Sequence, residues 1–274
     1  MSEHKYKIAV MMPTRGRTKS LFTSVKTLLE TASHPEQLEL WFGFDNDDQV
    51  GVEFWKSDVK PFLESTGIQH TALLFNRQGY SRLHVYFNTL AEKTDADWMF
   101  VWCDDAIMNT QGWDDVITAH DGEFTLLKVH THNEHPYSIF PIYPREWYDL
   151  FGFMSVHQMT DAELSQVAYM LDLVTIVDIT VTHDRFDLTG NNLDETNTSR
   201  VMHEGNPSSP LDFHHKGHIE HRFKMAHKIA DHLRQRGHDM TWWDNVLAGK
   251  QDPWVKMREN DINHQMVHAV VQTR

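Results

Sequence analysis

The sequence predicts an α/β protein in which helices flank a mainly parallel sheet and a helical extension follows at the C-terminus. Two observations support this prediction. Up to about residue 110, apolar segments of strand length alternate with segments whose apolar residues recur at helical spacing. Each apolar segment also ends in a polar cluster, and such clusters meet at one rim when the strands run parallel.

Four buried strands are expected in this region. The first ends at the turn PTRGR, the second at the acidic run DNDD, the third at NRQGYSR and the fourth at CDD. Continuous apolar runs bounded by such turn signals are typical of buried strands. We place these strands at residues 6–13, 38–45, 70–75 and 97–102.

Three helices are expected between these strands, at residues 20–32, 54–65 and 81–93. In the first helix, Leu21, Val25, Leu28 and Leu29 recur at the spacing that places side chains on one face. Helical connections of this kind are what parallel strands require. The four polar clusters should therefore line one rim of the sheet, where ligands bind in such folds.

The second half of the chain is expected to add strands at residues 123–131, 137–144 and 174–183. Thr160 and Glu163 form a capping-box pattern that predicts the start of a helix over residues 160–172. A stretch rich in Asn, Asp, Ser, Gly and Pro predicts a long loop at 190–210, followed by a helix at 213–236. We therefore divide the chain into a domain over residues 1–187 and an extension over residues 188–274.

Composition narrows the class of protein. The 274 residues are 40% hydrophobic and 23% charged, which fits a globular protein with a real core. The formal net charge of −14 argues against nucleic-acid binding over the whole surface, although it leaves room for a local basic face. The apolar runs fall short of a membrane span, so no membrane association is expected. The single cysteine, Cys103, excludes an internal disulfide, and a cytoplasmic protein is the default expectation. Nothing in the sequence indicates an oligomeric state.

The fourth strand ends in two adjacent carboxylates, Asp104 and Asp105, within FVWCDDAIMNTQGW. Like charges at the end of a buried strand repel each other, and a hard divalent cation such as Mg²⁺ or Mn²⁺ would offset that repulsion. Such a cation would also neutralise a diphosphate leaving group. The competing interpretation is that the two aspartates only terminate a turn.

Four elements in order resemble the GT-A fold of glycosyltransferases, in particular the large family-2-like group. They are PTRGR, then FDNDD, then GYSRLHVYFN, and finally the D-x-D-like VWCDDAIMNTQGW. The resemblance covers roughly residues 6 to 185. It implies an enzyme that uses Mn²⁺ or Mg²⁺ to transfer a sugar from a nucleotide-diphosphate donor, such as a UDP-sugar, to an acceptor hydroxyl. An inverting reaction is the expectation.

The resemblance also implies roles for individual residues. The turn after the first strand would approach the nucleotide, and Asp45 would accept hydrogen bonds from the base or ribose. Asp105 and His183 would hold the metal, and Asp161 would be the base that activates the acceptor. The residues expected to bind the donor are Pro13, Thr14, Arg15, Arg17, Asp45, Tyr80, Arg82 and Asp104.

One position departs from the family pattern. The first carboxylate of the D-x-D-like motif aligns with Cys103, and a soft thiol is a poor ligand for hard ions. We therefore expect Cys103 to be a small buried side chain, with Asp105 favoured for the metal. The cysteine also favours an alternative, a nucleotide- or DNA-binding module without turnover. Nucleotidyl transfer is a further alternative, although its usual glycine-rich loop is missing.

The segment FHHKGHIEHRFKMAHKIADHLRQRG differs from the rest of this acidic chain. Between Lys216 and Arg236 it has six Lys or Arg and two Asp or Glu. Such a segment can provide a face for an anionic acceptor such as DNA, and some phage-encoded GT-A-like enzymes glycosylate hydroxymethylated DNA bases. The competing interpretation is a helix that packs its apolar face on the core and leaves its charges in solvent.

Overall fold

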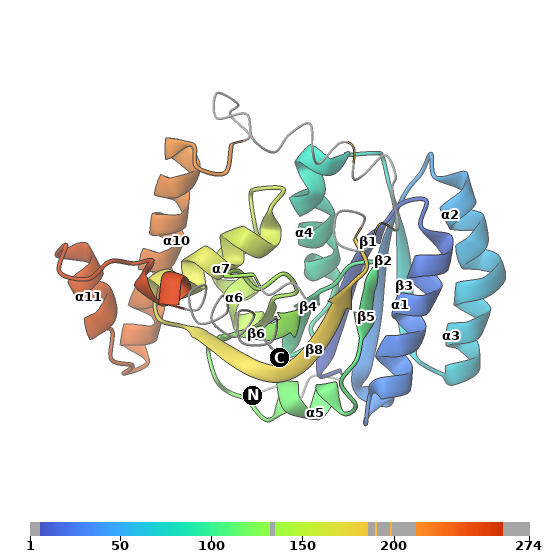
Figure 1. The fold of residues 1–274 in the computed structure, drawn as a ribbon, viewed down its shortest axis with the longest axis horizontal. Helices are drawn as coiled ribbons and strands as arrows, with labels where there is room; N and C mark the ends of the chain where they lie inside the picture. The colour runs from blue at the N-terminus through green and yellow to red at the C-terminus, as the bar shows by residue number, and fades with distance from the viewer. Residues whose placement is uncertain (1–5, 132–134, 186–189, 191–197, 199–211, 260–274) are drawn as a thin grey trace, which may run out of the picture.

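The computed structural model describes residues 6–131, 135–185, 190, 198 and 212–259. An eight-stranded sheet with strand order β3-β2-β1-β4-β7-β6-β8-β5 runs through the molecule. Helices α1, α2 and α3 cover one side of this sheet, and α4, α6, α7 and α10 cover the other (Figure 1). This arrangement confirms the predicted α/β class.

Four neighbouring strands form the parallel half of the sheet: β1 (Ile8–Thr14), β2 (Leu38–Asp45), β3 (Gln69–Phe75) and β4 (Trp98–Val101). Thr14 pairs with Phe44, and Asp45 pairs with Phe75, so these strands end at one level. The expected strands at this end of the chain are confirmed to within about two residues at each boundary. Their polar continuations therefore meet at one rim, as the sequence predicts.

The helices of this half are α1 (Thr18–Thr31), α2 (Gln49–Phe54), α3 (Lys60–Thr66) and α4 (Leu83–Lys93). A π-helical turn, Trp55–Val59, joins α2 to α3, and 3₁₀ turns lie at Pro35–Gln37 and Tyr80–Arg82. The helix expected at 54–65 begins earlier than predicted. It begins there because the Asp48 carboxylate accepts a hydrogen bond from Gly51 N at 3.1 Å, which caps the first turn of α2.

The second half of the sheet is mixed. It contains β5 (Ala106–Met108), β6 (Leu126–Thr131), β7 (Ile142–Pro144) and β8 (Val174–His183). β7 lies antiparallel to β4 and β6, β6 is parallel to β8, and β5 is antiparallel to β8. β8 has the predicted bounds, β7 is shorter than the predicted 137–144, and β5 was not predicted because three residues show no usable periodicity.

The remaining helices are α5 (Trp113–Thr118), α6 (Arg145–Phe151), α7 (Thr160–Met170), α10 (Lys216–Gln235) and α11 (Thr241–Leu247). The expected capping box at α7 does not form. Met159 precedes the first turn, and the Thr160 hydroxyl donates to His157 O at 3.3 Å. Glu163 instead bonds to backbone N–H groups before the helix, which fixes the approach of the chain to α7.

Two apolar cores lie on opposite sides of the sheet. Successive β1 residues alternate between them, with Val10 and Met12 in the core beneath α1 and Met11 in the core beneath α4. Helix α10 packs against α7 with the apolar face Met225, Ala226, Ile229, Ala230 and Leu233. The helix thus packs on the core as the competing interpretation of this segment describes, and it begins at Lys216 rather than at residue 213.

The predicted boundary at residue 187 and the predicted loop over 190–210 lie almost entirely outside the described residues. The division into two units therefore stays a prediction. None of the described helices combines the length and the apolarity that spanning a bilayer requires.

Candidate active site

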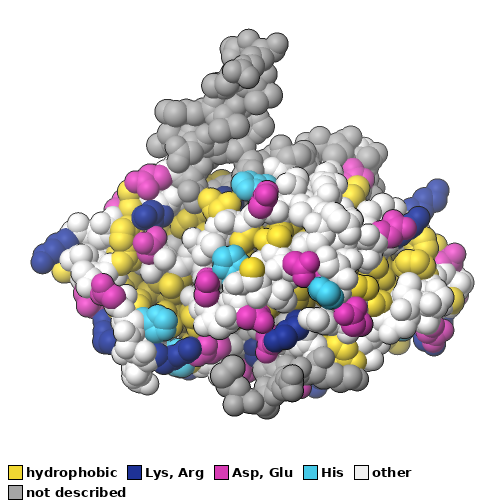
Figure 2. Space-filling model, turned by 90° about the horizontal axis from the view of Figure 1, so that it is seen from below, with side chains coloured by type: hydrophobic (Ala, Val, Ile, Leu, Met, Phe, Trp, Pro, Cys, Tyr) yellow, Lys and Arg dark blue, Asp and Glu magenta, His cyan; other side chains and the backbone are white. Residues whose placement is uncertain are grey.

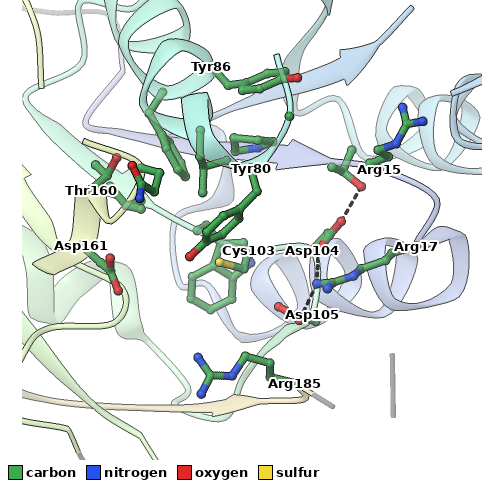
Figure 3. A pocket seen from close by; sticks show the side chains of 18 of the residues that line it. Arg15, Arg17, Tyr80, Tyr86, Cys103, Asp104, Asp105, Thr160, Asp161 and Arg185 are labelled. Atoms are coloured by element: carbon green, nitrogen blue, oxygen red, sulfur yellow. Dashed lines mark hydrogen bonds and ion pairs between the residues drawn. The ribbon is translucent and has the colours of Figure 1, made fainter. Parts of the chain in front are cut away.

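A pocket opens at the rim where the parallel strands end (Figure 3). Its lining comes from the turns after β1, β2, β3 and β4, from the start of α7 and from the end of β8. The lining residues are Pro13, Thr14, Arg15, Arg17, Asp45, Arg77, Gly79, Tyr80, Leu83, Tyr86, Phe87, Val101, Trp102, Cys103, Asp104, Asp105, Ile139, Gln158, Thr160, Asp161, His183 and Arg185. Of the predicted site residues, Arg82 alone does not line it.

The acidic pair lies in the short connection between β4 and β5. Helix α1 holds this connection, because Ser24 Oγ donates to Cys103 O at 3.1 Å and accepts from Trp102 Nε1 at 2.7 Å. The Thr14 hydroxyl donates to Asp104 Oδ2 at 2.6 Å. Both carboxylates are buried. These contacts with Ser24 and Thr14 hold the two carboxylates in place at the end of β4.

Arg17 compensates the charge of this pair. Its Nη1 lies 3.0 Å from Asp104 Oδ1 and 2.5 Å from Asp105 Oδ2, and one guanidinium thus bridges the two carboxylates (Figure 3). Burial raises the pKa of Asp104 to about 6 against the opposing effect of Arg17. For Asp105, burial is outweighed by the neighbouring imidazole of His183 and by the charge of Arg17, so its pKa is lowered.

The second half of the chain delivers His183 to Asp105. β5 pairs antiparallel with β8 so that Ala106 lies opposite His183, and Asp184 N donates to Asp105 O at 2.8 Å. His183 Nε2 lies 3.3 Å from Asp105 Oδ1. That carboxylate oxygen is buried and accepts no hydrogen bond from the described residues. An uncommitted buried oxygen beside an imidazole fits a divalent cation, so the predicted metal ligands lie together.

Cys103, which the sequence predicts to be a small buried side chain, packs on the core and also lies beside this group. Its Sγ, a carboxylate oxygen of Asp105 and a ring nitrogen of His183 lie within 4.8 Å of one another. The side chain is half-buried and lines the pocket. Burial and the neighbouring carboxylates raise the pKa of the thiol. The strand-end position of Cys103 explains this placement, because the chain turns toward the pocket directly after Trp102.

The opposite end of the pocket is built around Asp45. The Tyr86 hydroxyl, on α4, donates to Asp45 Oδ1, and Arg15 Nη1 lies 3.1 Å from Asp45 Oδ2. Burial and the bond to Asp45 raise the pKa of Tyr86 to about 12, so this hydroxyl keeps its proton. Arg15 also bonds to Asp47, with Nη1 2.5 Å from Oδ1.

The turn between β1 and α1 has a conformation that favours glycine. Gly16 has φ of 71°, in the left-handed region, and its N–H donates to Asp48 Oδ2 at 2.8 Å. This bond ties the PTRGR turn to the acidic turn after β2. Asp48 therefore joins the two turns that border the Asp45 end of the pocket.

Asp161 lies at the start of α7, across the pocket from the acidic pair (Figure 3). Burial raises its pKa to about 6, against the backbone N–H of Ala162 and the charges of His183 and Arg185. A carboxyl with a pKa near neutral pH is suited to accept a proton from a substrate hydroxyl. The structure thus places the predicted base in the same pocket as the predicted metal ligands.

The loop before α4 places one of its two predicted residues in the pocket. The Tyr80 ring projects into the pocket in Figure 3, whereas Arg82 is exposed and lies outside it, because the 3₁₀ turn directs the two side chains differently. Arg77 and Arg185 line the pocket but were not selected from the sequence. Their positions in the strand-end segments NRQGYSR and VTHDRFD are the signal that could have identified them.

The basic charge of α10 is largely compensated. Lys216 pairs with Glu220, Arg234 pairs with Asp231 and Asp244, and Arg236 pairs with Glu146. Arg222 is buried and donates to Phe213 O at 2.9 Å, and Lys228 donates to Leu150 O. On the face shown in Figure 2, the Lys and Arg side chains of the described residues are scattered among acidic ones.

The fold resembles solved glycosyltransferases, although the sequences agree little. The mannosyltransferase PcManGT from Pyrobaculum calidifontis, solved with GDP-Man and Mn²⁺, matches with a TM-score of 0.55 at 9% identity, over 94% of this chain and 86% of that one. S. aureus TarS 1–349 with UDP-GlcNAc matches with a TM-score of 0.53 at 13% identity, over 90% of this chain and 72% of that one.

A longer S. aureus TarS structure matches with a TM-score of 0.50 at 12% identity. The match covers 65% of this chain but only 37% of the TarS chain. No protein-family model matches the sequence, and no curated protein matches it. At such low identities the likeness concerns the fold. It confirms the GT-A-like architecture that the sequence predicts.

Proposed function

We propose that this protein is a glycosyltransferase that moves a sugar from a nucleoside-diphosphate donor to an acceptor hydroxyl. The observation that carries the proposal is one pocket that contains Asp45 at one end, Asp104, Asp105 and His183 in the middle, and Asp161 across from them. The neighbours of the fold, solved with GDP-Man and Mn²⁺ or with UDP-GlcNAc, support it. The transferase domain comprises residues 1–187, and residues 188–274 form its extension.

The donor nucleoside binds at the Asp45 end in this proposal. Tyr86 and Arg15 both bond to Asp45, so the carboxylate is fixed and its remaining acceptor capacity is directed at a ligand. Pro13, Thr14 and Tyr80 form neighbouring walls of the pocket. Arg82 stays a predicted donor contact whose exposed position requires movement to reach the pocket.

Asp105 and His183 hold Mn²⁺ or Mg²⁺ in this proposal, and Asp104 contacts the ribose. A bound cation would supply positive charge against the leaving diphosphate. Arg17 already bridges the carboxylates and can pair with phosphate, because its guanidinium faces the same space. Charge stabilisation of the leaving group is then divided between this arginine and the cation.

Asp161 acts as the base that removes the proton of the acceptor hydroxyl. Its pKa of about 6 leaves it ionised at neutral pH and basic enough to accept a proton. Attack assisted by a base from the side opposite the diphosphate inverts the anomeric centre. The proposed reaction is therefore inverting, and the anomeric configuration of the product measured by NMR tests this assignment.

The acceptor is a hydroxyl compound that reaches Asp161. The paired and buried basic residues of α10 give no support to a DNA acceptor, because at least five of its six Lys and Arg between residues 216 and 236 have partners. A hydroxymethylated base in phage DNA remains one acceptor to test, beside small alcohols and sugars.

The decisive experiment incubates the purified full chain with UDP- and GDP-sugars and Mn²⁺ or Mg²⁺, and identifies the released nucleotide. Release of nucleoside diphosphate supports glycosyl transfer. Release of pyrophosphate indicates a nucleotidyltransferase instead. Nucleotide binding without turnover that persists in Asp105→Asn indicates a binding module, and Asp95→Asn, an exposed carboxylate outside the pocket, is the matched control.

A further inference from the structure

The thiol of Cys103 lies beside both predicted metal ligands, Asp105 and His183. Its Sγ lies within 4.8 Å of donor atoms of both Asp105 and His183, and this is the one such group of three or more potential ligands among the described residues. The side chain lines the pocket and is partly accessible. The sulfur atom therefore faces the same space as the carboxylate and the imidazole.

A second observation points independently to a cation at this place. Asp105 Oδ2 bonds to Arg17, but Oδ1 is buried, accepts no hydrogen bond from the described residues, and lies 3.3 Å from His183 Nε2. A buried carboxylate oxygen without a hydrogen bond is costly unless something else coordinates it. The oxygen belongs to the same three-atom group as the sulfur.

We propose that Cys103 is a third protein ligand of the cation, and that this set of sulfur, nitrogen and oxygen donors makes the site prefer the borderline ions Co²⁺ and Zn²⁺, and to a smaller extent Mn²⁺, to Mg²⁺. This inference rests on the proposed function only in placing a cation beside Asp105. It adds Cys103 as a ligand and a preference of the site against Mg²⁺.

The selectivity follows from the chemistry of the donors. Mg²⁺ requires hard oxygen ligands and gives up its water reluctantly, so a sulfur and an imidazole nitrogen contribute little to its binding. Later divalent ions bind both donors, and their affinity rises from Mn²⁺ through Co²⁺. Coordination replaces the S–H bond with an S–metal bond and releases the proton to solvent.

Cobalt gives a direct measurement that does not depend on turnover. The sequence has one cysteine, so a thiolate-to-Co²⁺ charge-transfer band in the near-ultraviolet can come only from Cys103. We expect this band when the purified full chain is titrated with Co²⁺. It should be absent in Cys103→Ser, although Co²⁺ still binds, and Asp105→Asn should weaken binding itself.

Metal competition measures the selectivity. We expect the ratio of Mn²⁺ to Mg²⁺ affinity to be about tenfold lower in Cys103→Ser than in the wild type. It should be lower still in Cys103→Asp, which supplies an oxygen ligand at this position. An unchanged ratio, or Co²⁺ bound through Asp105 without the sulfur band, overturns the proposal. Thermal unfolding of each variant shows whether a loss of binding reflects misfolding.

The two proposals fail in distinguishable ways. If sugar transfer occurs but the sulfur band is absent, the ligand role of Cys103 is wrong and the glycosyltransferase assignment stands. If the band appears but no nucleotide sugar is turned over, the metal site is real and the proposed function is wrong.

Discussion

Two buried acidic sites of this protein differ in how their charge is compensated. Asp104 and Asp105 face a pocket and share Arg17 as a cationic partner. Glu163 lies outside the pocket lining and is fully buried at α7; its Oε2 accepts hydrogen bonds from Ser155 Oγ and from the N–H groups of Val156 and His157.

The difference shows which carboxylate is available for chemistry. Backbone N–H groups of its own chain segment satisfy Oε2 of Glu163, so this side chain fixes a loop. Glu163 Oε1 and Asp105 Oδ1 are both buried and accept no hydrogen bond from the described residues, and each has a histidine nearby: His221 Nε2 at 3.9 Å from Glu163 and His183 Nε2 at 3.3 Å from Asp105. Only Asp105 lines the pocket and has an arginine partner, Arg17, which directly precedes α1. Burial and unsatisfied oxygens do not distinguish these carboxylates. Their position in the pocket and their shared arginine distinguish Asp104 and Asp105 from Glu163.

The largest expected effect tests the functional side of this contrast. Asp105→Asn removes the charge that the cation needs, and we expect the transfer rate to fall ~1,000-fold, since charge stabilisation at a leaving group contributes several kcal/mol. Steady-state kinetics with a nucleotide sugar and Mn²⁺ measure it. The melting temperature should change little, because the amide oxygen can still accept a hydrogen bond from Arg17. A rate near that of Asp95→Asn would contradict the metal role.

Asp161→Asn should have the next largest effect on rate. An amide cannot accept the acceptor's proton, so we expect kcat to fall ~100-fold while donor binding stays near the wild-type value. Calorimetric titration with the nucleoside diphosphate separates binding from transfer. Equal losses in both quantities would indicate that Asp161 shapes the pocket instead of acting as a base.

Glu163→Ala tests the structural side of the contrast. It leaves the N–H groups of Val156 and His157 without their carboxylate partner, and we expect unfolding to become easier by about 2–4 kcal/mol. Urea denaturation measures this change. The rate per folded molecule should stay within a few-fold of the wild type; a selective loss of rate would assign Glu163 to the active site.

The pH dependence sharpens the comparison within the pocket. Burial raises the pKa of both Asp104 and Asp161 to about 6. Below that pH the folded protein protonates both, so we expect the transfer rate to fall about tenfold or more for each pH unit below about 6. The residual rate of Asp161→Asn should fall less steeply.

The raised pKa values of Asp104 and Asp161 also affect stability. At neutral pH these two groups lower the free energy of unfolding, and this destabilising effect is lost as pH falls from about 6 toward 4.

Tyr86→Phe should have the smallest effect. It removes the hydroxyl that donates to Asp45, and we expect nucleotide affinity to fall about threefold to tenfold, because Tyr86 positions Asp45 and does not itself bind the nucleotide. Titration with UDP or GDP measures it, and the transfer rate at saturating donor should be unchanged. A larger effect on rate than on affinity would place Asp45 closer to the reacting atoms than we propose.

Much of this architecture could be predicted from the sequence because the parallel half follows simple periodicity. The apolar runs before Pro13, Asp45 and Asp104 are long enough to identify strands, and β8 was predicted with its observed bounds. Placing Asp105, Asp161 and His183 in one pocket follows from strand ends meeting at a rim, together with the resemblance to GT-A enzymes.

The remaining features depend on tertiary contacts that no local pattern encodes. Strand β5 has three residues and exists only because it pairs with β8. The bridge from Arg17 to two carboxylates, the bond from Tyr86 to Asp45 and the position of Cys103 beside His183 join residues far apart in the chain. Arg82 ends the 3₁₀ turn Tyr80–Arg82 and lies outside the pocket lining, a position that the local sequence pattern does not indicate.

The pairing of β5 with β8 has a consequence for the order of folding. Asp105 follows β4, whereas His183 ends the last strand of the sheet, 78 positions later (183 − 105). Contacts between such distant segments form late, after most of the chain has lost its conformational freedom. A nascent chain that stops before β8 would carry the aspartates without the imidazole, so tight metal uptake would report that synthesis has passed residue 183.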